Sequence, residues 1–193
     1  MSTIVYYVRH GQTAWNAQRR FQGRRDISLN EQGVAQARRN GRALAEVLHD
    51  PGDFRFICSP LSRARKTMEV MREEMGLAPD GYEILNDLIE ASYGDFEGWT
   101  VADIERDRPG DFNARKADPW HFQPTGGESM AMVQARIAQL IAGLPERCVI
   151  VGHGAVGRAF RRQMLRLSEA QASDFAFPQD KVFRFEGGRE ELI

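Results

Sequence analysis

Short apolar runs alternate along this chain with longer segments whose apolar positions repeat at helical spacing. The runs at residues 4–8, 54–58, 82–85 and 148–151 are brief and bounded by polar, proline or glycine residues, which is typical of buried β-strands. Two more apolar stretches, at residues 175–177 and 182–185 around Pro178, predict strands at the edge of the same sheet.

The segments between the runs predict amphipathic helices, because their apolar residues recur every three or four positions. These stripes fall at residues 34–48, 61–75 and 130–144, and shorter helices are expected at residues 100–108 and 155–167. Ser28 and Glu31 fit a capping box for the first helix, with Asn30 as the rival N-cap. Ser59 and Pro60 predict the N-cap and the first helical residue of the second.

One segment breaks this regularity. Residues 109–127 contain Pro109, Pro119 and Pro124 and end in Gly126 and Gly127, so they predict mostly loop. Whether this loop acts as a lid stays open from the sequence. Elsewhere, strands alternate with helices. This order indicates the α/β class, as a three-layer α/β/α sandwich with a mostly parallel central sheet and helices on both faces. We expect one domain over residues 1–193.

Composition narrows the class of protein. The chain is 42% hydrophobic and 27% charged with a formal net charge of -1, so no global field recruits nucleic acid or an acidic membrane. We see no apolar run long enough to span a bilayer and no signal peptide, and we therefore expect a cytoplasmic protein. Cys58 and Cys148 lie inside strand-like runs, where buried reduced thiols are expected.

Candidate catalytic residues lie where the predicted strands end. The first strand ends in Arg9-His10-Gly11, and the fourth strand ends in Gly152-His153-Gly154. The second leads to Arg63 and the third to Glu90. If these strands are parallel, two imidazoles, two guanidiniums and one carboxyl meet at one rim of the sheet, where open α/β sheets bind ligands.

Such a set suits phosphoryl transfer through a histidine. A neutral imidazole is a nucleophile with a pKa near working pH. Guanidinium matches phosphate oxygens two at a time. A carboxyl in a partly apolar pocket can serve as general acid, and electrostatic stabilisation of the moving group does the rest.

Other interpretations of these residues stay open from the residues alone. Considered alone, His153 fits a hydrogen-bonded core histidine, and Arg63 fits a partner for a helix carboxylate. Asp87, Asp95 and Glu97 are rivals of Glu90 for the role of acid. Four further arginines form either a solvated face or a funnel for anions; they are Arg19, Arg20, Arg24 and Arg25. We assign His49 and His121 to solvent or loop, and we expect no metal site because no histidines pair at i, i+4.

The blocks that carry these residues resemble the histidine phosphatase superfamily, also called phosphoglycerate mutase-like. They come in the family's order from residue 4 to about residue 167. The matching blocks are Arg9 to Thr13 with Asn16, Phe21 to Gly33, Ser59 to Thr67, Glu90 with Tyr93-Gly94 and Glu97-Gly98, Gly126 to Ser129, and Val151 to Gly154.

The resemblance implies a role for each matched residue. His10 would take the phosphoryl group and become a phosphohistidine, while Arg9, Arg63 and His153 would clamp its oxygens. Glu90 would protonate the leaving alkoxide and then help to remove a proton from water. The resemblance also implies substrate-binding residues, which are Asn16, Gln22, Gly23, Glu128 and Ser129. It implies no metal and no cofactor.

Mutases and phosphatases of this family share one site. The short chain and the phrase from Glu90 to Gly98 look more like the phosphatase branch, and we expect a phosphomonoesterase acting on a small phosphorylated metabolite and releasing inorganic phosphate. The alternative is phosphoglycerate mutase-type transfer between hydroxyls. A non-catalytic module that binds phosphoesters is a third, less favoured hypothesis. The substrate stays undetermined, and a homodimer stays open.

Overall fold

The computed structural model describes residues 3–193 of the chain, and six of its segments pair as strands of one sheet. In chain order these are β1 (Ile4–Arg9), β2 (Arg55–Cys58), β3 (Glu83–Ile84), β4 (Arg147–Gly152), β5 (Val182–Glu186) and β6 (Arg189–Leu192). Their order across the sheet is β3-β2-β4-β1-β5-β6. The first four of these neighbours run parallel, whereas β5 pairs antiparallel with β1 and β6 antiparallel with β5.

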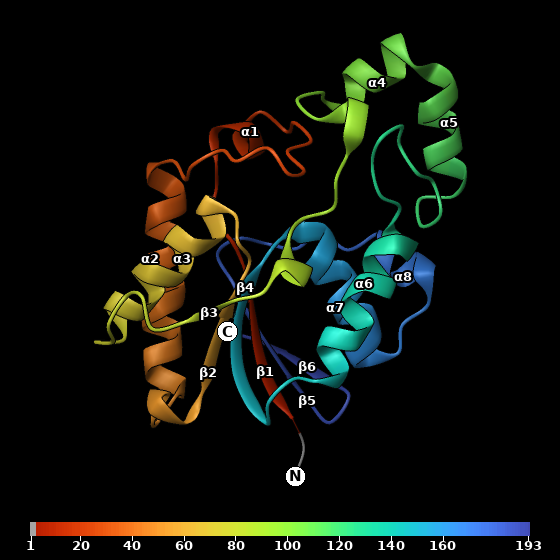
Figure 1. Cartoon of the computed structure of the whole chain (residues 1–193). Helices are drawn as coiled ribbons and strands as arrows, with labels where there is room; N and C mark the ends of the chain where they lie inside the picture. Colours follow the sequence, from red (N-terminus) through yellow and green to blue (C-terminus); the bar gives the residue numbers. More distant parts are fainter. Residues whose placement is uncertain (1–2) are drawn as a thin grey trace.

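Helices cover both faces of the sheet (Figure 1). The α-helices are α1 (Ala14–Ala17), α2 (Glu31–Val47), α3 (Ser62–Glu74), α4 (Val101–Asp107), α5 (Pro109–Ala117), α6 (Met130–Ala142), α7 (Gly154–Leu165) and α8 (Glu169–Ser173). Three short 3₁₀ helices are η1 (Pro51–Asp53), η2 (Asn86–Leu88) and η3 (Gly94–Phe96). Helices α2 and α3 pack on one face, and α6, α7 and α8 lie on the other, so the predicted three-layer α/β/α sandwich is confirmed.

Two apolar clusters form the core, one on each face of the sheet. Strand side chains alternate between them, because successive residues of a strand point to opposite faces. Tyr6 and Val8 pack with α2 and α3, whereas Val5 and Tyr7 pack with α6 and α7. Cys58 and Cys148 are buried, unpaired thiols that belong to different clusters. In the described part of the chain, no helix is both long and apolar enough to cross a bilayer.

Several predicted boundaries were wrong, each for a local reason. Residues 109–127 are not loop throughout, because Pro109 begins α5 in its first turn, where a missing N–H costs nothing, whereas residues 118–127 are irregular as expected. Helix α3 begins at Ser62 with Leu61 as its N-cap and not at Ser59, whose hydroxyl bonds to a histidine instead. Asn30, and not Ser28, caps α2.

The ends of the fold also differ from the prediction. Residues 175–177 are not a strand, whereas 182–185 lies in β5, which turns through Gly187 and Gly188 into β6, a strand that the sequence analysis missed. Helix α7 ends at Leu165 because Arg166 is left-handed, with φ 55°. The short α1 falls in a segment that we expected to be loop. His49 and His121 are exposed, as expected.

The loop after β1 lies against the first turn of α2 with no room for a side chain. A Cβ built on Gly33 would lie 2.2 Å from the carbonyl oxygen of Gln12, and one built on Gly11 would lie 2.2 Å from the carbonyl oxygen of Gly33. Since both neighbours are backbone atoms, neither can move without shifting the loop that carries the strand-end residues.

We therefore expect Gly33→Ala to destabilise the protein by about 1–3 kcal/mol, the usual cost of overpacking. The matched control is Gly110→Ala in α5, where a Cβ meets nothing within 4 Å. That change should leave the free energy of unfolding unchanged or raise it by a few tenths of a kcal/mol, because alanine is the better helix former. Urea unfolding of the three proteins measures both effects, and equal stabilities would contradict this account of the loop.

Candidate active site

Backbone hydrogen bonds join the loops that follow β1 and β2 to the carboxyl end of β4. The backbone N–H of His10 donates to the Gly152 carbonyl at 2.9 Å, and that of Ser59 donates to the Val151 carbonyl at 3.0 Å. The Tyr7 hydroxyl lies between β1 and β4, donating to the His153 carbonyl at 2.8 Å and accepting from its N–H at 3.0 Å. The parallel register therefore brings His10, Ser59 and His153 together.

The imidazole of His10 is held in one tautomer. Its Nδ1 lies 2.7 Å from the Gly11 carbonyl oxygen, which can only accept, so Nδ1 carries the ring proton. Its Nε2 is then unprotonated and accepts from Arg63 Nε at 3.2 Å. Burial lowers the pKa of His10 well below its ordinary value, and the charges of Arg63 and Arg9 lower it further. His10 is therefore a buried, neutral imidazole at neutral pH.

Arg63 lies in the first turn of α3 and is 1% exposed. Besides the bond to His10, its Nη2 donates to the Gly23 carbonyl at 2.7 Å and its Nη1 to the Arg25 carbonyl at 2.8 Å. Burial lowers the pKa of Arg63 to about 10, against the opposing charges of Glu90 and other carboxylates, so the guanidinium stays charged at neutral pH. A cation is thus fixed beside the unprotonated nitrogen of His10.

His153 lies next to His10, with ring centroids 5.1 Å apart. Its Nε2 is 2.6 Å from the Ser59 hydroxyl, and its buried Nδ1 has no hydrogen-bond partner within residues 3–193. Burial lowers the pKa of His153 well below its ordinary value, with Arg63 and His10 adding to the shift. His153 therefore fits both interpretations, because it is a hydrogen-bonded core histidine that also contacts the strand-end cluster.

Arg9 and Glu90 complete the cluster. Arg9 donates to the Phe177 carbonyl at 2.7 Å, and its buried Nε has no partner among residues 3–193. Burial lowers the pKa of Arg9, and the negative charge of Glu90 partly offsets this. The Glu90 carboxylate accepts from the N–H groups of Ala155 and Val156 at 3.3 and 3.4 Å, so the first turn of α7 fixes its position.

A cavity opens over this cluster, and four of the five predicted catalytic residues line it. These are Arg9, His10, Arg63 and Glu90. His153 lies beneath its surface and is fully buried. The predicted substrate-binding residues Asn16 and Gln22 also line the cavity. The structure therefore brings the side chains that follow the strand ends together at one rim of the sheet.

The segment from Thr13 to Gly23 forms one wall of this cavity. The amide of Gln22 lies between the Thr13 hydroxyl and Arg63, which can only donate. The orientation that satisfies both sides puts its oxygen 3.1 and 3.0 Å from Arg63 Nε and Nη1 and its nitrogen 2.6 Å from Thr13 Oγ1. Gly23 contributes its carbonyl to Arg63 and has φ +53°, a conformation that favours glycine. The side-chain oxygen of Asn16, Oδ1, accepts from the Gln179 amide at 3.0 Å.

The other two predicted substrate-binding residues lie elsewhere. Glu128 does not line this cavity, because its carboxylate turns away to bind Arg24 at 3.1 Å and Arg136 at 3.3 Å. Ser129 caps α6 by accepting from the Met132 N–H. Both residues serve the helix and its ion pairs, and Glu128 lines a neighbouring cavity. Their role in binding a substrate stays a prediction.

The rival acids are also separated from the cavity. Neither Asp87, Asp95 nor Glu97 lines it, and only Glu90 among the four does. Asp95 pairs with Arg108 at 3.4 Å on the surface. Burial and position therefore favour Glu90 over its neighbours in the chain.

The arginine cluster between residues 19 and 25 is divided. Arg24 and Arg25 form ion pairs with carboxylates at 3.1 and 3.3 Å. Arg19 and Arg20 line the cavity, and Arg20 also lies 3.9 Å from a carboxylate oxygen of Asp103. The arginines of this cluster thus serve both as partners of carboxylates and as positive charges at the cavity.

Several residues that line the cavity were not predicted from the sequence. Tyr93 was part of a matched block, but Arg115, Arg158 and Gln179 were not singled out. Arg115 lies on α5, which we expected to be loop, and Arg158 lies one turn into α7, five residues after His153. An arginine on the first turns of a helix that follows a histidine at a strand end is the one signal that would have indicated Arg158.

Comparison with known proteins agrees with this geometry. Residues 5–192 match the Histidine phosphatase superfamily (branch 1). The chain is 35% identical over 184 residues to the 2,3-bisphosphoglycerate-dependent phosphoglycerate mutase of Methylobacterium radiotolerans, covering 90% of this chain and 84% of that protein. It is also 35% identical over 176 residues to the glucosyl-3-phosphoglycerate phosphatase of Mycobacterium tuberculosis, covering 84% of this chain and 75% of that protein.

A solved structure extends the likeness to three dimensions. The native structure of mycobacterial glucosyl-3-phosphoglycerate phosphatase superposes with a TM-score of 0.78 at 30% identity, covering 100% of this chain and 97% of that one. The relatives include both mutases and phosphatases, and all of those named here are enzymes. On the match over nearly its whole length, this chain belongs to the histidine phosphatase superfamily (branch 1).

Proposed function

We propose that this protein is a metal-independent phosphomonoesterase that acts on a small phosphorylated metabolite through a phosphohistidine on His10. The observation that carries the proposal is the state of His10. Its Nδ1 is bound to the Gly11 carbonyl, its unprotonated Nε2 accepts from the buried guanidinium of Arg63 at 3.2 Å, and the residue lines the cavity. A neutral imidazole beside fixed cations is suited to attack a phosphorus atom whose oxygens are negative.

In the first step, Nε2 of His10 bonds to phosphorus while the bond to the ester oxygen breaks. Arg9 and Arg63 donate to the phosphoryl oxygens, with His153 as the third donor of the clamp. Glu90, in its protonated form, gives its proton to the leaving oxygen. In the second step, water loses a proton to the Glu90 carboxylate as its oxygen bonds to phosphorus. The P–N bond breaks, which frees His10 and releases inorganic phosphate.

Transfer between hydroxyls is the second candidate, and the 35% identity to a phosphoglycerate mutase favours it. The two activities differ only in whether water or a second hydroxyl accepts the phosphoryl group. Side-by-side assays of para-nitrophenyl phosphate and 3-phosphoglycerate separate them. Hydrolysis without isomerisation supports the esterase, and efficient isomerisation supports the mutase.

The covalent intermediate gives the sharpest test of the nucleophile. On incubation with a labelled phosphomonoester and rapid quenching, the wild-type protein should carry an acid-labile, alkali-stable phosphate. His10→Ala should carry none, and its turnover should fall by a factor of at least about 10³, as expected for loss of a nucleophile. Lys116→Ala, on the exposed face of α5, is the control. A protein with neither adduct nor hydrolysis would be a binding module.

Glu90→Gln should slow esters according to their leaving groups. Alkyl phosphates need a proton on the departing oxygen, so their kcat should fall about 10²–10⁴-fold, the usual contribution of general acid catalysis. Para-nitrophenyl phosphate, which has a good leaving group, should be slowed much less. Asp95→Asn, a change at a surface ion pair, is the matched control. Equal slowing of every ester would assign the proton donor to another group.

The neutrality of the two histidines should also appear in the stability of the protein. Below pH 6.5 the unfolded chain binds a proton at each imidazole, whereas the folded protein, in which the pKa of His10 and of His153 is lowered, does not. The protein is therefore more stable above pH 6.5. As the pH falls below this value, its free energy of unfolding decreases by up to about 1.4 kcal/mol per pH unit for each group.

Urea unfolding between pH 7.5 and 5.5 measures this slope. His10→Gln and His153→Gln should each remove about half of the loss, because each removes one of the two protons. A wild-type protein whose stability does not change over this interval would show that the folded imidazoles are protonated like those of the unfolded chain, against the state of His10 on which the esterase depends.

A further inference from the structure

The segment that carries Glu90 has no regular secondary structure. Residues 89–93 lie between η2 and η3, outside the sheet and the α-helices, and Glu90 and Ala91 are buried. The sheet therefore does not hold this segment in place. Because buried backbone groups need hydrogen-bond partners, other parts of the chain have to supply them.

Two arginines from distant parts of the chain hold the backbone that leads up to the Glu90 side chain. Arg136 of α6 donates from Nη1 to the carbonyl of Ile89 at 3.0 Å and also to the carbonyl of Asp87. Arg24, in the loop between α1 and α2, lies with its Nε 3.5 Å from the carbonyl oxygen of Glu90 itself. Side chains thus do for this backbone what a neighbouring strand does elsewhere in the protein.

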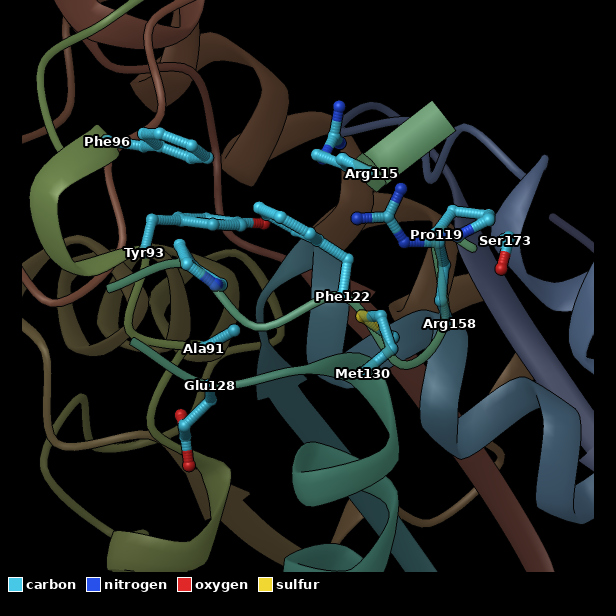
Figure 2. A pocket seen from close by; sticks show the side chains of 11 residues that line it. Ala91, Tyr93, Phe96, Arg115, Pro119, Phe122, Glu128, Met130, Arg158 and Ser173 are labelled. Atoms are coloured by element: carbon cyan, nitrogen blue, oxygen red, sulfur yellow. The ribbon is translucent and has the colours of Figure 1, made fainter. Parts of the chain in front are cut away.

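The carboxylate of Glu128 joins these two arginines. Its Oε2 lies 3.1 Å from Arg24 Nη2, and its Oε1 lies 3.3 Å from Arg136 Nε. Oε2 also accepts from the N–H of Ser92 at 3.0 Å, and the Glu128 N–H donates to the Ser92 carbonyl at 2.8 Å. Figure 2 shows the Glu128 side chain turned away from the aromatic rings of the neighbouring cavity. Glu128 therefore binds the backbone after Glu90 and both cations that hold the backbone before it.

The charge of this carboxylate is what keeps the two arginines in place. Its side chain is 14% exposed, and that of Arg136 is 17% exposed, so water screens their interaction only in part. Without the negative charge, Arg136 and Arg24 would repel each other, and a partly buried cation without a partner is costly. The guanidinium groups would then turn toward water and release the carbonyls that they bind.

Arg24 also belongs to the loop that holds Arg63. The carbonyls of its two neighbours in the chain, Gly23 and Arg25, accept from the Arg63 guanidinium at 2.7 and 2.8 Å. The network around Glu128 therefore connects the residues that fix Arg63 to the residues that fix Glu90.

We propose that Glu128 is a positioning residue for proton transfer by Glu90, acting through Arg24 and Arg136. The inference rests on the proposed function, in which Glu90 gives its proton to the leaving oxygen. Two groups that exchange a proton must lie within hydrogen-bond distance, and a displacement of about 1 Å can cost about 10²-fold in rate. Glu128 does not line the cavity over His10, so its removal affects the step that needs Glu90 and spares the attack on phosphorus.

Two esters of similar size test this role, because only one of them needs a proton on its leaving oxygen. Glu128→Gln keeps the size of the side chain and removes its charge. For benzyl phosphate, which releases an alkoxide, kcat should fall about 10–100-fold. For para-nitrophenyl phosphate, which has a good leaving group, kcat should fall less than about threefold. KM should change less than about twofold for either ester, because the residues that clamp the phosphoryl group are unchanged.

Glu190→Gln is the matched control. Glu190 pairs with Arg161 at 2.6 Å, both side chains are 18% exposed, and neither residue lines the cavity over His10. Urea unfolding should show a loss of stability in Glu190→Gln as in Glu128→Gln, since each variant leaves a partly buried arginine without its carboxylate. Only Glu128→Gln should change the ratio of kcat between the two esters.

Arg136→Gln gives a second measurement of the same network. It should show the same selective loss for benzyl phosphate, because it removes the donor to the Ile89 carbonyl. The double variant with Glu128→Gln should lose no more than the larger of the two single losses, since residues that act through one network are not additive. If Glu128→Gln does not fold, the ratio of kcat in Arg136→Gln decides.

Two outcomes overturn the inference. One is an equal loss of kcat for both esters, which a general structural effect would produce. The other is a rise in KM with kcat unchanged, which would make Glu128 a substrate-binding residue. Failure of the proposed function looks different. A wild-type protein without a phosphohistidine removes the nucleophile, and a Glu90→Gln protein that slows every ester equally removes the acid. A phosphohistidine and a normal Glu90→Gln result, together with equal slowing in Glu128→Gln, remove only the positioning role.

Discussion

The buried guanidinium of Arg63 is the interaction on which the site depends. It is a charge with almost no contact with solvent, and it persists because its nitrogens bond to two other parts of the chain, the loop after β1 and residues 23–25. One nitrogen donates to His10 after β1, and the other two donate to backbone carbonyls of Gly23 and Arg25. Breaking any of these bonds would leave an unpaired buried charge, which is far more costly than an unpaired neutral group. The loop and the nucleophile are thereby held in one geometry.

That geometry determines the protonation of the cluster. An imidazole in water would be partly protonated near pH 6.5 and would make a poor nucleophile while it carried the proton. Here desolvation and neighbouring cations act in the same direction on His10, so Nε2 stays unprotonated and accepts a hydrogen bond from Arg63. The Gly11 carbonyl decides which nitrogen carries the remaining proton. In the proposed reaction, the charge that stabilises the phosphoryl group is also the charge that keeps its acceptor neutral.

The other arginines that line the cavity extend its positive charge away from His10. Helices α4 and α5 stand beyond the carboxyl ends of the parallel strands (Figure 1), which is the side on which the cavity opens. Helix α5 lies outside the three layers of the sandwich, and it brings Arg115 to the cavity. The sandwich thus holds Arg9, His10 and Arg63, and the excursion adds Arg115 to the lining of the same cavity.

The sequence by itself determined the fold class and the position of the strand-end residues. Alternating apolar runs and stripes specify which faces are buried, and parallel strands bring their carboxyl ends to one rim wherever the helices lie. Arg9, His10 and Arg63 could therefore be assigned to one site from their places in the chain. The matching order of blocks added the family and Glu90.

Only the tertiary structure decided what each polar group binds. Ser59 looks like a helix cap in the sequence, but its hydroxyl bonds to His153, a residue 94 positions away. Glu128 lies in a matched block, yet its carboxylate is taken by arginines. Arg115 and Arg158 carry no local pattern that distinguishes them from surface arginines. Hydrogen bonds and ion pairs act over a few ångströms, so their partners depend on packing between distant segments, which the periodicity of a sequence does not encode.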